Sequence, residues 1–306
     1  MVATVLRPAL RSRHLTATQV PTQPIAYAGE PGAFAEDAVV AAFGDVERRP
    51  VAGFREVFEA VTRGEAGSGV VPIENLVNGS VREVYDLLLE HDLDITGEVV
   101  VPVDLCLAAP DGASLEGIRR VYSHIQALGQ AERFLRTRRW NLLTTYNTAG
   151  AGKLVAEDGD RTAAAVLSPR AAARFGLAVL AGSIQDVPEN RTRFHVVGPA
   201  RADAPGPAAA GDGPFRTTLA FGVRNEPGTL LQALRVFADR SINMSKLESR
   251  PSRAAAWEYV FWADLDAHRA DSNCAAAIDE LAVAATMVRV FGSYARASEP
   301  VIAVPR

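Results

Sequence analysis

The chain has 306 residues, of which 48% are hydrophobic and 22% are charged, values typical of soluble globular proteins. A net charge of −4 argues against nucleic acid or an anionic membrane as the main partner, because both bind strongly basic surfaces. No apolar run reaches the roughly 18 residues of a membrane-spanning helix, and at about 150 residues per domain the length predicts two domains.

Two stretches of the chain are poorly suited to packing. Residues 1–24 carry three arginines and no acidic residue, a composition that fits either an organelle transit peptide or a disordered extension. Prolines at 8, 21 and 24 favour the disordered extension. Residues 199–214 are rich in Ala, Gly and Pro and are predicted to be a linker. The sequence therefore predicts a first domain over 25–198 and a second over 215–296.

Strand and helix signals alternate along the first domain. Short apolar segments bounded by turn residues predict strands, and apolar residues at helical spacing predict helices between them. This alternation is typical of an α/β fold with a largely parallel sheet, in which ligands bind beyond the carboxyl ends of the strands. The predicted strands include 25–28, 69–73, 118–121, 142–146 and 163–167, and the predicted helices include 123–135, 148–156 and 169–175.

Polar residues gather where these predicted strands end, at 29–34, 74–75, 123–126 and 147–150. Helix N-termini at these points would favour a small dianion, because their backbone N–H groups lack partners within the helix. A second interpretation stays open at two of them. Ser123 and Gln126 also fit a capping box, and Thr148 also fits a plain N-cap.

The segment 189–194 combines a hydroxyl, two guanidinium groups and an aromatic ring immediately before an apolar strand. Arginine side chains bind carboxylates through paired hydrogen bonds, so the segment fits an anion site. It fits a loop-to-strand junction equally well. The two cysteines, Cys106 and Cys274, are far apart and predict buried thiols in a reducing cytoplasm. The five histidines show no metal-ligand spacing, so no metal site is expected.

The second domain has the pattern strand, helix, strand, strand, helix, strand. An alternating strand is predicted at 217–223, and four leucine or phenylalanine side chains at helical spacing follow it. Further strands are predicted at 244–248, 258–264 and 287–291, with a helix at 275–285 before the last. The order βαββαβ predicts an α+β ferredoxin-like fold.

Taken together, five motifs in order make residues 25–296 resemble the prephenate dehydratase family. The motifs are GEPGAF at 29–34, VPIEN at 71–75 with GSV at 79–81, SH at 123–124 with QAL at 126–128, NTAG at 147–150, and TRF at 192–194. The resemblance implies a catalytic domain of two α/β lobes like those of periplasmic binding proteins, with the substrate between the lobes. It also implies that the second domain is a regulatory ACT domain.

The resemblance implies a cytoplasmic carbon–oxygen lyase that needs no cofactor. Such enzymes convert prephenate to phenylpyruvate in phenylalanine biosynthesis, and relatives act on arogenate. It implies that Thr192 is the principal catalytic residue, that Arg193 binds a carboxylate, and that Phe194 keeps the cleft dry. Glu74 would be a protonated acid or merely a cap. The residues implied for substrate binding are Asn75, Ser123, Gln126, Thr148 and Ala149.

In the second domain the resemblance rests on PGTLL at 227–231 and ESRP at 248–251. In the family these segments bind phenylalanine between paired domains, which implies an allosteric homodimer or homotetramer. The residues implied are Asn225, Pro227, Gly228, Thr229, Leu230, Glu248, Ser249, Arg250 and Pro251.

Three positions depart from the family pattern: Ala35, Leu76 and Ile125. Leu76 matters most, because it replaces a hydroxyl expected at the cleft with an apolar side chain. Two alternatives therefore remain beside the dehydratase. One is a paralogue that decarboxylates prephenate without forming an aromatic ring, and the other is a non-enzymatic protein that binds an amino acid or keto acid.

Overall fold

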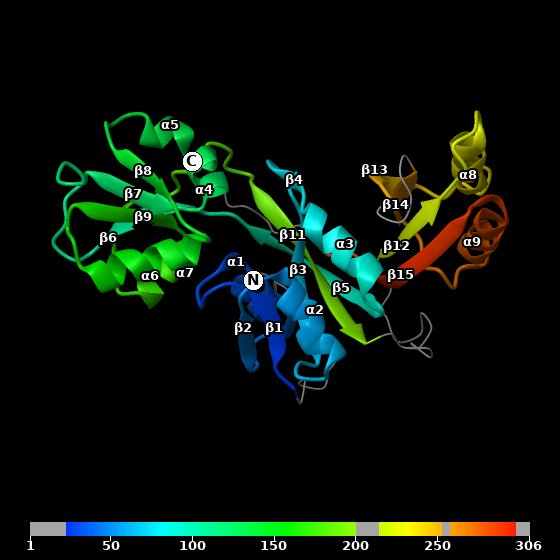
Figure 1. Ribbon diagram of the computed structural model, residues 1–306, viewed down its shortest axis with the longest axis horizontal. Helices are drawn as coiled ribbons and strands as arrows, with labels where there is room; N and C mark the ends of the chain where they lie inside the picture. Colours follow the sequence, from blue (N-terminus) through cyan, green and yellow to red (C-terminus); the bar gives the residue numbers. More distant parts are fainter. Residues whose placement is uncertain (1–22, 200–213, 253–257, 298–306) are drawn as a thin grey trace, which may run out of the picture.

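The computed structural model describes residues 23–199, 214–252 and 258–297. Its three parts lie in a row, with one lobe of the first domain in the middle (Figure 1). The other lobe, drawn in green, lies on one side, and the C-terminal domain, drawn in yellow to red, lies on the other. The extension predicted at 1–24 and the linker predicted at 199–214 lie almost entirely outside the described residues.

The first lobe is built on a six-stranded sheet with the order β2-β1-β3-β11-β5, in which β4 pairs with β3. Helix α1 covers one face of the sheet, and α2 and α3 cover the other. The elements are β1 (Ile25–Ala28), α1 (Phe34–Phe43), β2 (Arg48–Val51), α2 (Phe54–Thr62), β3 (Ser68–Asn75), β4 (Gly79–Ser80), α3 (Arg82–Glu90), β5 (Leu93–Pro102) and β11 (Arg191–Pro199).

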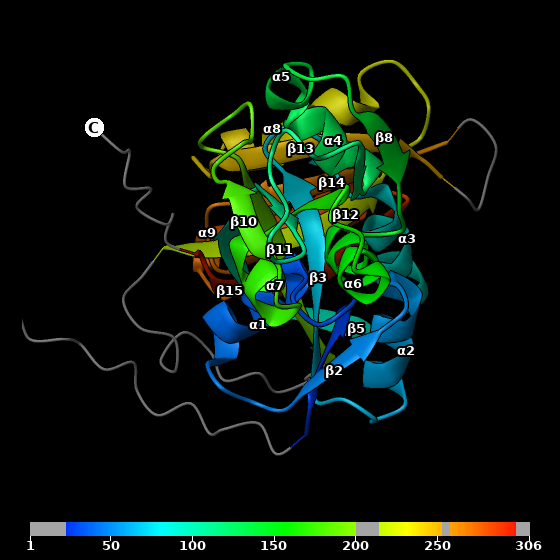
Figure 2. The same cartoon turned by 90° about the vertical axis from the view of Figure 1, so that its left-hand side faces the viewer.

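The second lobe is built on a five-stranded sheet with the order β10-β6-β9-β7-β8. Figure 2 views the molecule from this end, with α4, α6 and α7 near the viewer. The elements are β6 (Cys106–Ala109), β7 (Arg120–Ser123), α4 (Ile125–Gln130), α5 (Glu132–Leu135), β8 (Asn141–Thr144), α6 (Thr148–Asp158), β9 (Ala163–Leu167), α7 (Pro169–Arg174) and β10 (Ala178–Ala181).

Both sheets are mixed, so the prediction of a largely parallel sheet needs correction. Strands β1, β2 and β3 are mutually parallel, as are β7, β8 and β9, but β11 runs antiparallel to both β3 and β5. The chain leaves the first lobe after β5 and returns to it along β11. These two strands, which connect the lobes, run in opposite directions. The local hydrophobic pattern carries no information about their relative direction. The helix predicted at 123–135 is also divided, into α4 and α5 at Ala131.

The C-terminal domain has the predicted βαββαβ order and an antiparallel sheet with the order β13-β14-β12-β15, which confirms the ferredoxin-like fold. Helices α8 and α9 pack on one face of the sheet. The elements are β12 (Phe215–Gly222), α8 (Thr229–Ala238), β13 (Met244–Pro251), β14 (Tyr259–Leu265), α9 (Ser272–Ala284) and β15 (Met287–Ala295).

The other face of this sheet packs directly on the first lobe. Trp262 and Phe291 stack at 4.6 Å, and they share one apolar core with Tyr85 of α3 and Ile95 of β5. A Cβ atom added to Gly292 would lie 2.1 Å from the Ile95 carbonyl oxygen, so only glycine permits this approach of β15 to β5. Because both of its faces are covered, β12 is buried along almost its whole length rather than on alternate residues.

Candidate active site

The clearest polar site lies where β3 ends and β11 begins. Asn75 Nδ2 donates to Thr192 Oγ1 at 2.9 Å, and also to Asn190 Oδ1 at 3.1 Å. Its Oδ1 accepts the backbone N–H groups of Val77 and Asn78, both at 3.0 Å. These backbone donors fix which amide atom faces Thr192, because only an oxygen can accept from them. The Thr192 oxygen is therefore an acceptor for Asn75, and its own O–H is left to donate elsewhere.

Arg193 and Glu74 lie on the opposite face of the same strands, toward the C-terminal domain. Neighbouring side chains of an extended strand point to opposite faces, so the Thr192 hydroxyl lies beside Asn75 whereas the Arg193 guanidinium lies beside Asp264 of the C-terminal domain. The Arg193 guanidinium contacts Glu74 Oε2 and Asp264 Oδ2, both at 2.8 Å, and Glu98 Oε2 at 3.4 Å. The implied role of Arg193 as a binder of substrate carboxylate therefore differs from the observed arrangement, in which carboxylates of the protein occupy it.

Glu74 is an ionised partner in this cluster rather than a protonated acid or a helix cap. Burial raises its pKa, but Lys246 and Arg193 outweigh burial and hold the pKa below its usual value of 4.5. The two cations lie 3.2 and 2.8 Å from its Oε2. A carboxyl group with a lowered pKa is a poor proton donor near neutral pH.

Phe194 lies in the core of the first lobe. Its side chain is 2% exposed and packs in one cluster with Ile25, Tyr27 and Val39. Strand alternation places it on the same face of β11 as Thr192, but it does not line either of the hollows described below.

The predicted residues of the second lobe sit at the carboxyl edge of its parallel strands. Ser123 is fully buried and donates to the Val166 carbonyl at 2.6 Å, so it does not form the capping box. His124 caps α4 instead, because its Nδ1 accepts the backbone N–H of Gln126. Gln126 itself is exposed. These positions leave Gln126 the more accessible of the two for a ligand.

Asn147, not Thr148, caps α6, and its Oδ1 accepts the Gly150 N–H at 2.6 Å. Thr148 is the first residue of the helix and is partly buried, and Ala149 is buried. Asn147 lies beside Gly29 of the first lobe, since a Cβ on Gly29 would be 3.6 Å from Asn147 Nδ2. The α6 N-terminus therefore faces the loop that follows β1.

Two residues in this region were not predicted from the sequence. Asn190, which is 1% exposed, contacts Asn75 and donates to Gln130 Oε1 of α4 at 2.7 Å, so it links the lobes. Glu30 contacts Tyr146 at 3.1 Å and Lys153 at 3.5 Å, and so links the lobes a second time. Glu30 could have been predicted, because it belongs to the motif at residues 29–34. For Asn190 the only sequence signal was its place two residues before Thr192.

The three departures from the family pattern occupy different environments. Ala35 is 8% exposed and packs in the first-lobe core, so a larger polar side chain there would meet apolar neighbours. Leu76 and Ile125 are 54% and 62% exposed. Leu76 follows Asn75 directly, and its N–H donates to the Arg191 carbonyl at 2.9 Å.

The residues implied for phenylalanine binding lie in the loop before α8 and on the edge strand β13. Gly228 has a φ of +87° and caps α8, and the Thr229 hydroxyl donates to the Arg224 and Glu226 carbonyls. Leu230 is partly buried, whereas Asn225 and Pro227 are exposed. On β13 the side chains alternate, with Glu248 and Arg250 turned toward the first lobe and Ser249 and Pro251 exposed.

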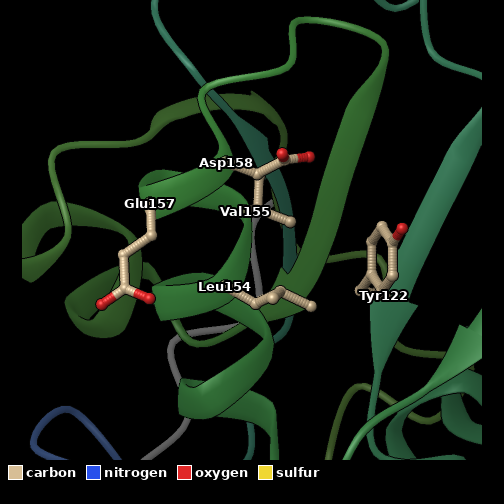
Figure 3. Close-up of a pocket in the computed structure, with 5 residues that line it drawn as sticks. All are labelled: Tyr122, Leu154, Val155, Glu157 and Asp158. Carbon is tan, nitrogen blue, oxygen red and sulfur yellow. The ribbon is translucent and has the colours of Figure 1, made fainter.

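Two hollows among the described residues bear on the site. One, of about 400 Å³, lies on the second lobe and is lined by Tyr122, Leu154, Val155, Glu157 and Asp158 (Figure 3). None of the predicted site residues line it, and its two carboxylates disfavour a dianion. The other, of about 390 Å³, lies at the junction of the domains and includes Asn75, Leu76, Arg193, Lys246 and Asp264 in its lining.

Both cysteines are buried, as predicted, and burial raises their pKa values to about 12 for Cys106 and about 11 for Cys274. Neither thiol is poised as a nucleophile. No helix in the part of the chain that the structure describes is long and apolar enough to cross a membrane.

Comparisons with known proteins agree with this fold. The sequence profile of prephenate dehydratase matches residues 25–202, and that of the ACT domain matches residues 217–282. A chloroplastic arogenate dehydratase/prephenate dehydratase of Arabidopsis thaliana is 40% identical over 88% of this chain and 72% of its own length.

Solved structures match over both domains. The structure of prephenate dehydratase from Arthrobacter aurescens in complex with L-Phe is 32% identical, with a TM-score of 0.81 over 92% of this chain and 93% of that one. A protein described as a novel type of quorum-quenching acylase is also 32% identical, with a TM-score of 0.82 over 90% of this chain and 98% of that one.

The family match and the named dehydratase relatives identify the protein as a lyase of aromatic amino acid biosynthesis. The chain belongs to the prephenate dehydratase family.

Proposed function

We propose that this protein converts prephenate to phenylpyruvate and that Thr192 is its principal catalytic residue. The observation that carries the proposal is the hydrogen bond from Asn75 to the Thr192 oxygen. Donation into that oxygen polarises the Thr192 O–H and directs it away from Asn75. A neutral donor held in this way suits a reaction in which hydroxide departs from a ring carbon.

The reaction needs little from the protein beyond holding the substrate and helping the hydroxide to leave. The ring carboxylate is released as CO2, and the electron pair of the broken C–C bond completes the aromatic ring. The ring C–O bond breaks at the same time, and the departing hydroxide becomes water by taking a proton. Thr192 donates a hydrogen bond to that oxygen as negative charge develops on it, and solvent supplies the net proton. Well-placed donors of this kind contribute about 10²–10⁴-fold to the rate.

The substrate carries two carboxylates, and the second lobe offers it backbone donors. The first turn of α6, which begins at Thr148, presents N–H groups toward the loop after β1. Gln126 of α4 adds an exposed amide at the same edge of the sheet. We assign the substrate carboxylates to these groups rather than to Arg193, whose guanidinium already contacts three carboxylates.

Arogenate is the alternative substrate. It differs from prephenate in carrying an ammonium and a hydrogen where prephenate carries the side-chain keto oxygen, and the Arabidopsis relative is named for both activities. We infer prephenate because the Arthrobacter relative is named for it. Purified protein is incubated with each substrate, and the product is identified by ultraviolet spectrum and mass. Phenylpyruvate from prephenate supports the proposal, and phenylalanine from arogenate alone would replace it.

Other outcomes of the same assay contradict the proposal. A decarboxylated, non-aromatic acid would identify the decarboxylating paralogue. If neither substrate is turned over, two alternatives remain. One is a non-enzymatic binding protein, and the other is a chemistry such as that of the similar quorum-quenching acylase, which shares the fold.

We further propose that phenylalanine inhibits the enzyme by binding to the ACT domain of a cytoplasmic homodimer or dimer of dimers. Strand β13 lies at the edge of its sheet and exposes 45% of Leu247, while the first turn of α8 exposes 70% of Leu231. An edge strand with an apolar side chain suits pairing with a second copy. The Arthrobacter relative was solved with L-Phe.

The effector is tested with L-phenylalanine, using D-phenylalanine as the control. We expect the L form alone to raise the melting temperature and lower turnover, since a ligand that binds only the folded state stabilises it. If saturating L-phenylalanine changes neither quantity, the regulatory proposal fails. Light scattering of wild-type protein and of Leu247→Arg tests the dimer, which we expect only in the wild type.

A further inference from the structure

The Arg193 side chain joins two strands of the catalytic domain to the ACT sheet. It contacts Glu74 at the end of β3, Glu98 on β5 and Asp264 on β14, and only 13% of it is exposed. Asp264 and Glu98 raise the pKa of Arg193 although burial opposes its charge. Carboxylates of the protein therefore already occupy three of the contacts that this guanidinium could offer to a substrate.

The Arg193–Glu74 contact lies next to the Thr192–Asn75 pair in the register of the two strands. In the register of β11 against β3, Thr192 lies opposite Asn75 and Arg193 lies opposite Glu74. The regular pairing lapses at the next step, since Phe194 lies opposite Pro72. Such an irregularity loosens the ladder and re-aims side chains, so the Arg193–Glu74 ion pair holds the strands together where their backbone pairing is least regular.

The ACT domain contacts the end of β3 through a second cation as well. Lys246 of β13 lies 3.2 Å from Glu74 Oε2 and 3.3 Å from the hydroxyl of Ser80 on β4. The Ser80 hydroxyl in turn donates to Glu248 Oε2 at 2.5 Å. Lys246 and Glu248 therefore share the face of β13 that touches the β3–β4 hairpin, two residues apart on the strand implied for phenylalanine binding.

We propose that Arg193 is a positioning residue that sets Thr192 against Asn75 and ties that geometry to the ACT domain through Asp264, while Lys246 makes the same tie through Glu74. The inference rests on the proposed function, because it explains how an effector on the ACT domain would alter turnover. A shift of β13 or β14 moves the carboxylates and the cation that hold Arg193 and Glu74. The catalytic hydroxyl on the other face then loses its alignment.

The kinetic test compares Arg193→Met, Asp264→Asn and the double variant with prephenate as substrate. Asp264 lies in the ACT domain, so we expect Asp264→Asn to reproduce most of the loss seen in Arg193→Met. Misalignment of a catalytic group predicts a fall in kcat of about 10- to 100-fold with KM nearly unchanged. The double variant should lose little more than Arg193→Met alone, because both changes break one connection.

Direct binding of substrate by Arg193 predicts a different result. Removing a guanidinium from a substrate carboxylate should raise KM by about 100-fold, and Asp264→Asn should then resemble the wild type. That outcome would overturn the inference. Arg193→Lys, which keeps the charge but not the forked geometry, should recover only part of kcat.

Arg289→Met is the matched control for a weakened domain junction. Arg289 of β15 also joins the domains, donating to the Leu89 and His91 carbonyls at 3.1 and 2.6 Å, but neither carbonyl contacts Glu74 or Thr192. We expect its kcat to stay near that of the wild type. A loss equal to that of Asp264→Asn would show that the junction in general, rather than Arg193, controls turnover.

Hydrogen exchange gives a readout that does not depend on activity. Asp264→Asn should speed amide exchange in residues 190–194, whereas Arg289→Met should not. Unchanged exchange in Asp264→Asn would overturn the inference, whether or not the wild type turns over either substrate. Lack of turnover by the wild type would refute only the proposed function.

The regulatory connection is tested with Lys246→Met. This variant should bind L-phenylalanine in calorimetry with nearly wild-type affinity yet be inhibited less. Undiminished inhibition would exclude Lys246 from the connection.

Discussion

Asn75 and Thr192 stand 117 residues apart in the chain and are joined by a hydrogen bond of 2.9 Å between the amide nitrogen and the hydroxyl oxygen. The amide is fixed at its other end by two backbone N–H groups of the turn after β3. The catalytic proposal depends on this fixed direction of donation, and it can be tested at both residues.

Replacing Thr192 by valine removes the hydroxyl while keeping the branched shape. We expect turnover of prephenate to fall by at least about 10²-fold, because the departing oxygen loses its hydrogen-bond donor. Steady-state kinetics measures the loss, and circular dichroism checks the fold. Thr192→Ser retains the hydroxyl and should keep most of the activity. Near-wild-type turnover in a folded Thr192→Val or Thr192→Ala protein would refute the catalytic role.

Asn75→Asp tests the direction of the hydrogen bond. One carboxylate oxygen can still accept the N–H groups of Val77 and Asn78. The other faces the oxygens of Asn190 and Arg191, which the amide nitrogen contacts in the wild type, so we expect the melting temperature to fall. The other oxygen cannot donate to Thr192, and instead accepts its hydroxyl proton. Turnover should then fall at least about 10-fold, because the hydroxyl is turned away from the substrate. Activity equal to the wild type would mean that the direction of this bond is irrelevant.

Leu76→Ser restores a hydroxyl that is usual in the family. A regained hydrogen bond to a charged group is worth about 1.5–3 kcal/mol, so prephenate turnover should rise by about 10-fold or more. Leu76 is 54% exposed, and the substitution should leave stability within about 0.5 kcal/mol. Val77→Ser is the matched control, since Val77 is also exposed at 44%. If Leu76→Ser gains nothing over this control, the leucine is not a weakened substrate contact.

The burial of His195 leads us to expect that the protein loses stability in mild acid. It is 1% exposed, and burial together with the nearby Arg193 lowers its pKa well below the usual 6.5. The histidine therefore stays neutral in the folded protein, whereas in the unfolded chain it takes up a proton once the pH falls below about 6.5. Stability contributed by the neutral form is complete above that pH and should decline by at most about 1.4 kcal/mol per pH unit below it.

Urea unfolding at about pH 7 and about pH 5 measures this decline. Asp264 and Glu74 have lowered pKa values, so their contribution is lost only at more acidic pH than this window. His195→Gln should therefore show a smaller difference between the two conditions than the wild type. If the free energy of unfolding changes equally between the two pH values in both proteins, the acid sensitivity arises from another group.

Much of this architecture follows from local sequence. The alternation of apolar strands and helical segments predicted the α/β lobes, and the βαββαβ order predicted the ACT domain. The crossing strands β5 and β11 were beyond such reasoning, because their antiparallel pairing joins segments about 100 residues apart. The capping pattern at Ser123 was also misleading, because the strand preceding it buries the hydroxyl against Val166.

The sequence by itself determined the family, through short motifs whose residues and order are specific, and it placed Thr192, Asn75 and Thr148 at the ends of elements. Only the tertiary structure decided which of these side chains share a site. Thr192, Arg193 and Phe194 are consecutive, yet the pleat of β11 turns Arg193 to the ACT domain and the other two away from it. Which partner covers each face of a strand depends on elements distant in the chain, and local pattern cannot specify it.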